Sequence, residues 1–384
     1  YSVYGTLWLV RSHAILEDQG EDLFTQSKYL ENYYKYYQAF SVDENLDTFF
    51  DVGDSPRFLW YSPAEIFAKL GQKYNSQEYE DLYSFYRFKV KKPKAGLMSA
   101  VYSLPKGSLN LLTKDLDHIY IQDIGVYSEK ILRKNFVVNS FFFKSGIAGG
   151  RWAHEMSAKD PSLRLNRSHS HPDQNHFIVW TPKGFLISDT GNSKKSKFTA
   201  GHNTLLIDGQ GQLGEGEKWF KENDLDGRSF SPAAGLTENN IFQTPEITIV
   251  GADVAEFYPS SADLKKFDRT IVWIKPRGFI IIDAVALNAA HVASVIFHSD
   301  FDYKLDENKK YWIMNDGRPI AKFIRLWPEN PSVEIKKHTE TLKHEQGPKG
   351  EFMTISQPLN SAGYFINAVV TDALPVSTHF SMEP

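Results

Sequence analysis

Cysteine is absent from the 384-residue chain. Its absence excludes disulfide bonds, thiolate metal sites and a cysteine nucleophile. A chain without cysteine fits an oxidising compartment, so we expect a secreted or periplasmic protein.

The chain also lacks an excess of positive charge and lacks long apolar runs. The chain has 43 Lys and Arg residues and 47 Asp and Glu residues, a formal net charge of -4. It therefore has no overall positive potential that would attract nucleic acid. A polyanion would therefore need a local basic patch. No apolar run approaches the ~20 residues of a membrane helix, so no membrane span is expected. The hydrophobic fraction of 41% is enough for a sizeable core.

The first part of the chain has the periodicity of helices. Helices are expected over residues 3–18, 23–40, 62–74 and 76–88. Ser62 and Glu65 form a capping box, with Pro63 at the first helical position. We therefore predict a helical part over residues 1–88, followed by a lysine-rich linker over residues 89–96.

Residues 97–384 consist of short β-rich runs separated by Gly, Pro, Asn and Asp, without a convincing long helix. The expected strands are 136–143, 177–180, 185–188, 204–207, 270–274, 279–282 and 292–298. The predicted fold class is α+β and multidomain, with helices followed by an antiparallel β-sandwich. Four amphipathic helices do not easily close a core alone. Either they pack on the sandwich or further helices precede Tyr1, and we favour the second alternative.

Side chains able to do chemistry are densest between Arg164 and His176. If this segment enters a strand, His169 and His171 project from one face. Asp189 closes a later apolar strand, and His202 opens the next. His171, Asp189 and His202 form a suitable ligand set for Zn²⁺ or another divalent cation. The alternative is that all of them are ordinary polar residues at strand ends.

The motifs in this region resemble those of the heparinase II/III-like superfamily of polysaccharide lyases, which includes heparin, heparan, alginate and oligoalginate lyases. They are His-Ser-His-Pro-Asp-Gln-Asn-His-Phe, Leu-Ile-Ser-Asp-Thr-Gly and His-Asn-Thr-Leu-Leu-Ile-Asp-Gly-Gln-Gly-Gln. The resemblance implies that the chain is the C-terminal part of an (α/α) toroid followed by antiparallel β-sheets. It also implies β-elimination of a uronic-acid polysaccharide in the cleft between them.

The resemblance further implies a role for each residue. His169 becomes catalytic, while His171, Asp189 and His202 hold a structural Zn²⁺. A toroid tyrosine acts as base or acid, and the form Tyr-x-x-Tyr makes Tyr1 the first candidate and Tyr4 the second. The neutralising Asn or His of the toroid would precede Tyr1, so we expect a toroid segment outside this chain.

Substrate contacts are expected from Arg164 and Arg167, whose planar guanidinium groups suit carboxylates, and from Lys195 in a lysine-rich stretch. Some alginate-cleaving members carry a tyrosine between the positions of Asp189 and His202. None stands there in this sequence, which favours a glycosaminoglycan-like substrate over alginate. The remaining alternatives are an alginate or oligoalginate lyase, a metal-dependent hydrolase, and a non-catalytic carbohydrate-binding fragment with a structural metal.

Overall fold

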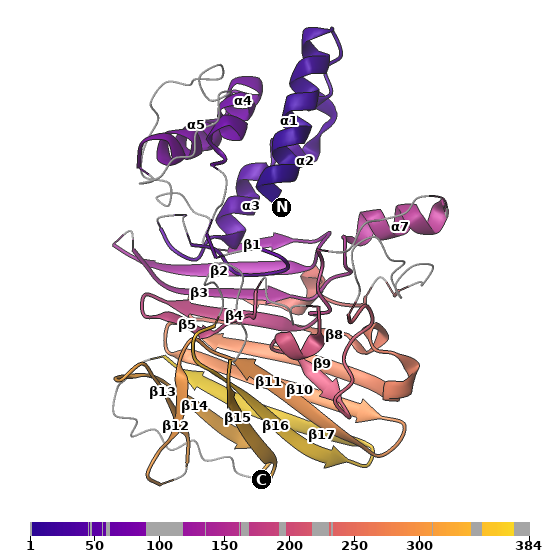
Figure 1. Cartoon of the computed structure of the whole chain (residues 1–384), viewed down its shortest axis with the longest axis vertical. Coiled ribbons are helices and arrows are strands. Elements are labelled where there is room, and N and C mark those ends of the chain that lie inside the picture. The colour runs from indigo at the N-terminus through magenta and orange to yellow at the C-terminus, as the bar shows by residue number, and fades with distance from the viewer. Residues whose placement is uncertain are drawn as a thin grey trace.

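The structure is a computed structural model, and it describes most of the chain. The described residues are 2–44, 46, 48–55, 57–58, 62–89, 118–134, 136–160, 162, 169–191, 197–216, 230–231, 233–308, 310–338 and 348–371. Helices occupy its first part and antiparallel sheets the rest (Figure 1). The helical segments of the first part end at Lys89, and the first described strand begins at His118. The predicted linker therefore falls almost wholly outside the described residues, and the domain boundaries stay a prediction.

The helical part has helices in all four regions expected from the periodicity, and α1 and the segment of α5 with its following turn match the predicted lengths. They are α1 (Ser2–Asp18), α2 (Lys28–Glu31), α3 (Tyr33–Phe40), α4 (Ala64–Tyr74) and α5 (Gln77–Ser84), with a 3-10 turn at Phe24–Gln26 and a π-helical turn at Phe85–Lys89. None of the helices in the described part of the chain is long and apolar enough to cross a membrane.

Two local helix predictions were wrong. The helix expected over residues 23–40 is divided, because Ser27 and Asn32 leave helical geometry and start separate segments. The capping box before α4 does not form: Pro63 is the N-cap itself, and Glu65 accepts a hydrogen bond from Arg11 of α1 at 2.6 Å. Ser62 Oγ still accepts the backbone N–H of Ala64 at 3.3 Å, so the ion pair with Arg11 replaces only the Glu65 half of the capping box.

The helices pack on the sheets. The rings of Phe40 and Phe50 lie 5.3 Å and 5.0 Å from the ring of Phe142, which belongs to strand β3. Ile178 and Phe185 of the same sheet join this apolar cluster. Because an amphipathic helix must bury its apolar face against another element, this sheet closes the core of the helical part.

Three antiparallel sheets form the remainder, so the predicted fold class is confirmed. The five-stranded sheet has the order β1 (His118–Ile121), β2 (Val126–Arg133), β3 (Phe136–Lys144), β4 (His176–Thr181) and β5 (Gly184–Ile187). The eight-stranded sheet has the order β12 (Asp302–Leu305), β13 (Trp312–Asn315), β14 (Pro319–Trp327), β17 (Ala362–Val370), β10 (Gly278–Leu287), β9 (Leu264–Ile274), β8 (Ile247–Asp253) and β7 (Ile241–Gln243). The four-stranded sheet has the order β15 (Ser332–Lys337), β16 (Glu351–Leu359), β11 (His291–His298) and β6 (Leu205–Ile207).

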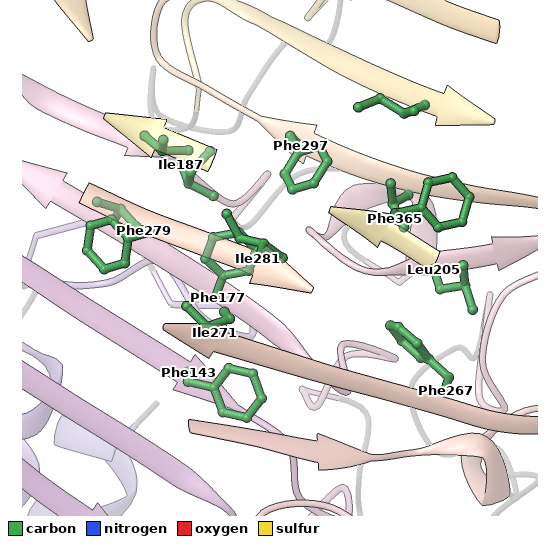
Figure 2. Close-up of a cluster of buried hydrophobic side chains, with 14 of the residues drawn as sticks. Phe143, Phe177, Ile187, Leu205, Phe267, Ile271, Phe279, Ile281, Phe297 and Phe365 are labelled. Atoms are coloured by element: carbon green, nitrogen blue, oxygen red, sulfur yellow. The ribbon is translucent and has the colours of Figure 1, made fainter. Parts of the chain in front are cut away.

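Alternating strand faces build the core between these sheets. In β9 the buried residues Phe267, Ile271 and Trp273 follow the period of two that a strand requires. Figure 2 shows Ile271 beside Phe177 of the five-stranded sheet, and Phe267 nearest to Leu205 of the four-stranded sheet; all four belong to one buried apolar cluster. One apolar interior thus joins all three sheets.

The described β part also contains a helix that the sequence analysis missed, α7 (Arg151–Lys159). It stands out beside the sheets in Figure 1, between β3 and the segment that leads to β4. Only His154 of this helix is buried. At nine residues it is shorter than the window of about 11–18 residues over which helical periodicity is read, so it was not recognised.

Candidate functional site

His169 and His171 lie in the loop before β4, so the condition that this segment enters a strand is not met. The strand begins only at His176. Pro172 lacks a backbone N–H and cannot enter a hydrogen-bonded ladder, which delays the start of the strand. The two imidazoles nevertheless face one common partner.

That partner is Asp54, in the loop between α3 and α4. Its Oδ2 lies 2.6 Å from His169 Nδ1, and its Oδ1 lies 2.9 Å from His171 Nε2. The side chain of His171 is fully buried, whereas that of His169 is 26% exposed. Burial alone would raise the pKa of Asp54, but the hydrogen bonds from His171 and His169 hold it below its usual value. Asp54 was not among the predicted site residues.

Asp189 and His202 meet beside this loop. Asp189 follows β5 and accepts the N–H of Gly191 at 2.8 Å, while its Oδ2 lies 2.8 Å from Nδ1 of His202. Both side chains are fully buried. Burial would raise the pKa of Asp189, but His202 and His176 hold it well below the ordinary value, so the carboxylate stays charged. A buried carboxylate beside imidazoles is a strong position for a cation.

His176 is a third imidazole at this point. Among the described residues, His176, Asp189 and His202 form the group whose potential ligand atoms all lie within 4.8 Å of one another. However, Nδ1 of His176 accepts the backbone N–H of Asn203 at 2.9 Å, so neutral His176 must carry its hydrogen on Nε2. That Nε2 lies 2.9 Å from Oδ2 of Asp189. A nitrogen that carries a hydrogen cannot bind a metal, so His176 supports Asp189 instead.

His171 does not belong to that compact group, but its ring has the opposite hydrogen arrangement to that of His176, which leaves a nitrogen lone pair for a metal. Its Nε2 points to Asp54, which as a charged carboxylate can only accept, so the lone pair of the neutral ring lies on Nδ1. This Nδ1 is buried and has no hydrogen-bond partner in the structure. The ring centroids of His171 and His202 are 5.2 Å apart. A carboxylate that orients a ligating histidine is the usual outer support of a zinc site.

A buried arginine holds the two chain segments that carry this group. Arg269 forms two hydrogen bonds to Asp283, at 2.6 Å and 2.9 Å, and both side chains are fully buried. Its Nη1 also donates to the backbone oxygens of Asn175, at 2.9 Å, and of Asn203. These residues precede His176 and follow His202. The pair thereby fixes the backbone on both sides of the candidate metal centre.

A second arginine, which is partly buried, joins the helical part to the sheets. Arg57 donates to Asp51 of its own loop and to Asp300 after β11, each at 2.7 Å, and its guanidinium lies 4.1 Å from the ring centroid of Phe185. Burial raises the pKa of Asp51, against the attraction of Arg57, and the nearby Asp189 raises it further. The Arg57 contacts hold the loop that contains Asp54 against the histidines.

Comparisons with known proteins agree with this architecture. Residues 156–344 match the family model described as "Heparinase II/III-like, C-terminal". The β-sheet half is a heparinase II/III-like domain. The resemblance drawn from the sequence motifs is thereby confirmed.

Solved structures with the same fold include the heparan sulfate lyase HepC from Pedobacter heparinus, with a TM-score of 0.64 and 14% identity over 96% of this chain and 51% of that one. The heparinase III-BT4657 gene product with methylated lysines has a TM-score of 0.59 and 13% identity, over 88% of this chain and 44% of that one. A further heparinase III has a TM-score of 0.57 and 12% identity, over 89% of this chain and 48% of that one. The chain thus spans about half the length of these proteins. No curated protein sequence matches it significantly.

Several of the predicted site residues fall outside the described residues or are placed only in part. Tyr1, Arg164, Arg167 and Lys195 lie outside the described residues, and Tyr4 is placed only as a residue of the first turn of α1. Close to the lysine-rich stretch, Lys197 donates to the backbone oxygen of Ser170, between the two histidines of the loop. This lysine therefore fixes the His-x-His loop.

We predict that the heparinase II/III-like domain binds one divalent cation, most suitably Zn²⁺, through His171, Asp189 and His202. Substitution of His171 by alanine removes one ligand and should lower both the metal content and the melting temperature. Elemental analysis and thermal unfolding with and without chelator measure both effects. His291→Ala is the matched control, because that histidine binds Asp208 and Asp263 at the surface. Purified protein without stoichiometric metal would disprove this assignment.

Proposed function

We propose that this protein is a polysaccharide lyase that cleaves a glycosaminoglycan by β-elimination, with a substrate of the heparan sulfate class. The observation that carries the proposal is the position of His169. This imidazole is partly exposed, is held by Asp54, and adjoins the buried group of His171, Asp189 and His202. Support also comes from the fold, because the similar solved structures include a heparan sulfate lyase.

The position of His169 suits β-elimination, because this reaction moves a proton and develops negative charge on the substrate carboxylate. Removal of the proton on C5 of a uronate develops negative charge on the adjacent carboxylate, which must be stabilised. His169 donates its Nδ1 hydrogen to Asp54, so its Nε2 carries the lone pair of the neutral ring. At that atom the imidazole can accept a proton and then donate it. A tyrosine at Tyr1 or Tyr4 is the proposed base.

The metal has a structural part in this proposal. When bound, it would cross-link the His-x-His loop to the chain segments after β5 and before β6, through His171, Asp189 and His202. His171 is two positions from His169, so this cross-link limits the movement of the catalytic imidazole. Arg164, Arg167 and Lys195 remain the proposed contacts to the acidic groups of the polymer, and a secreted or periplasmic location remains our expectation.

The proposed activity predicts an unsaturated product. β-Elimination leaves a C4–C5 double bond conjugated to the uronate carboxylate, and this chromophore absorbs in the ultraviolet. We expect absorbance to rise with heparan sulfate and to stay flat with alginate, when both polymers are incubated with the protein under identical conditions. Mass spectrometry of the products distinguishes elimination from hydrolysis, because hydrolysis adds water.

Three other results would redirect the assignment. A rise in ultraviolet absorbance with alginate and none with heparan sulfate would show that the domain belongs with the alginate-cleaving relatives. Binding of polymer by calorimetry, without unsaturated product, would identify a carbohydrate-binding module with a structural metal. Hydrolysed products would indicate a metal-dependent hydrolase.

A further inference from the structure

One carboxylate serves both histidines of the His-x-His loop. Each oxygen of Asp54 faces one ring: Oδ2 faces Nδ1 of His169 at 2.6 Å and Oδ1 faces Nε2 of His171 at 2.9 Å. The Asp54 side chain is only 13% exposed. The contacts use the δ nitrogen of one ring and the ε nitrogen of the other, so the two imidazoles present different nitrogens to their surroundings.

A charged carboxylate has acceptor sites and no hydrogen to donate. Both ring nitrogens that face Asp54 must therefore carry hydrogens. In the neutral rings the lone pairs then lie on Nε2 of His169 and on Nδ1 of His171. An asparagine at this position could not do the same, because its amide offers one oxygen and one NH₂ group. One of the two histidines would then face a donor and would have to change tautomer.

The backbone around Asp54 is built for this close approach. Gly53 has a φ of +64°, and a Cβ placed there would lie 3.0 Å from the backbone oxygen of His169. Arg57 fastens the other side of the loop, between Asp51 and Asp300. The loop that contains Asp51, Gly53, Asp54 and Arg57 thus packs closely against the His-x-His loop.

We propose that Asp54 is a positioning residue that sets the tautomers of His169 and His171 together. It thereby couples the imidazole that faces substrate to the imidazole that binds the metal. The role assigned to His169 rests on the proposed function, whereas the role toward His171 does not.

Asp54→Asn tests the proposal because it keeps the size of the side chain and removes one acceptor. Loss of a residue that orients a metal ligand or catalytic group typically costs about 10- to 100-fold in metal affinity or activity. We expect a loss of that order in kcat, in metal affinity, or in both, with KM little changed because Asp54 does not bind substrate. Nitrogen-15 NMR of the ring nitrogens should show that one of the two histidines has changed tautomer.

Asp306→Asn is the matched control. Asp306 is also buried and also organises a turn, where it accepts backbone N–H groups of Asn308 and Tyr311 between β12 and β13. The same chemical change there should leave kcat, metal affinity and both ring tautomers unaltered. A decrease in melting temperature alone, in either variant, would report only on packing.

The outcomes separate this inference from the proposed lyase activity. If the unmodified protein gives no unsaturated product, the proposed function fails, and metal affinity and ring tautomers still decide the role of Asp54. Unchanged metal affinity, unchanged kcat and unchanged tautomers in Asp54→Asn would overturn the inference. A variant that loses only thermal stability would overturn it as well, because a purely structural carboxylate behaves in that way.

Discussion

Substitution of Arg269 by methionine should destabilise the protein by about 3–5 kcal/mol, the usual effect of leaving one charge of a buried pair without its partner. Asp283 would remain fully buried with no cation beside it. The backbone oxygens of Asn175 and Asn203 would lose a donor at the same time. We expect a large decrease in the melting temperature, and a weaker metal site because both segments flank its side chains.

A matched substitution on the same strand provides the control. Lys266 pairs with Asp268 on β9, but the side chains are 47% and 35% exposed. Such a pair contributes about 0–1 kcal/mol, so Lys266→Met should have little effect. Equal destabilisation by the two substitutions would mean that burial does not determine how much an ion pair contributes to the stability of this protein.

The double variant Arg269→Met with Asp283→Leu separates charge from hydrogen bonding. Removing both charges should recover part of the lost stability, because buried pairs can often be replaced by apolar residues at little cost. Recovery should stay incomplete, since the oxygens of Asn175 and Asn203 still have no donor. Full recovery would show that these two hydrogen bonds contribute little.

The architecture could be predicted from the sequence because it depends on local periodicity. Strands such as β9 and β10 alternate buried and half-buried residues, and this pattern is visible in the residue types. The helix α7 was missed because its nine residues are too few to establish a helical period. The division of the helix expected over residues 23–40 was missed because Ser27 acts as an N-cap, accepting the N–H of Leu30, within a run of otherwise helical residues.

The site was only partly predictable, because its most informative contacts cross the molecule. Asp54 is far from the histidines in sequence, and nothing in periodicity connects them. The signal available was the segment Asp51 to Arg57, where two aspartates and an arginine stand in a Gly- and Ser-containing loop between apolar helices. His176 could be seen in the motif, but its role depends on which nitrogen accepts the N–H of Asn203. Only three-dimensional geometry determines that.

His169→Ala should have the largest effect on the proposed activity. A group that transfers a proton in general acid–base catalysis contributes typically at least ~100-fold, and we expect a loss of that size in kcat, measured from the rate of unsaturated product formation. The variant should keep its metal. His171 would still donate Nε2–H to Oδ1 of Asp54, and Asp189 and His202 are untouched.

The comparison with His171→Ala makes this prediction decisive, because the two histidines share one loop and one carboxylate. His171→Ala should lose metal, stability and activity together, whereas His169→Ala should lose activity alone. The surface variant His291→Ala should lose neither, since its partners are Asp208 and Asp263. Near-normal turnover in His169→Ala would remove this residue from the mechanism. Loss of the metal in His169→Ala would mean that its effect on activity acts through the metal centre, because the imidazole would then be needed to keep the ligands in place.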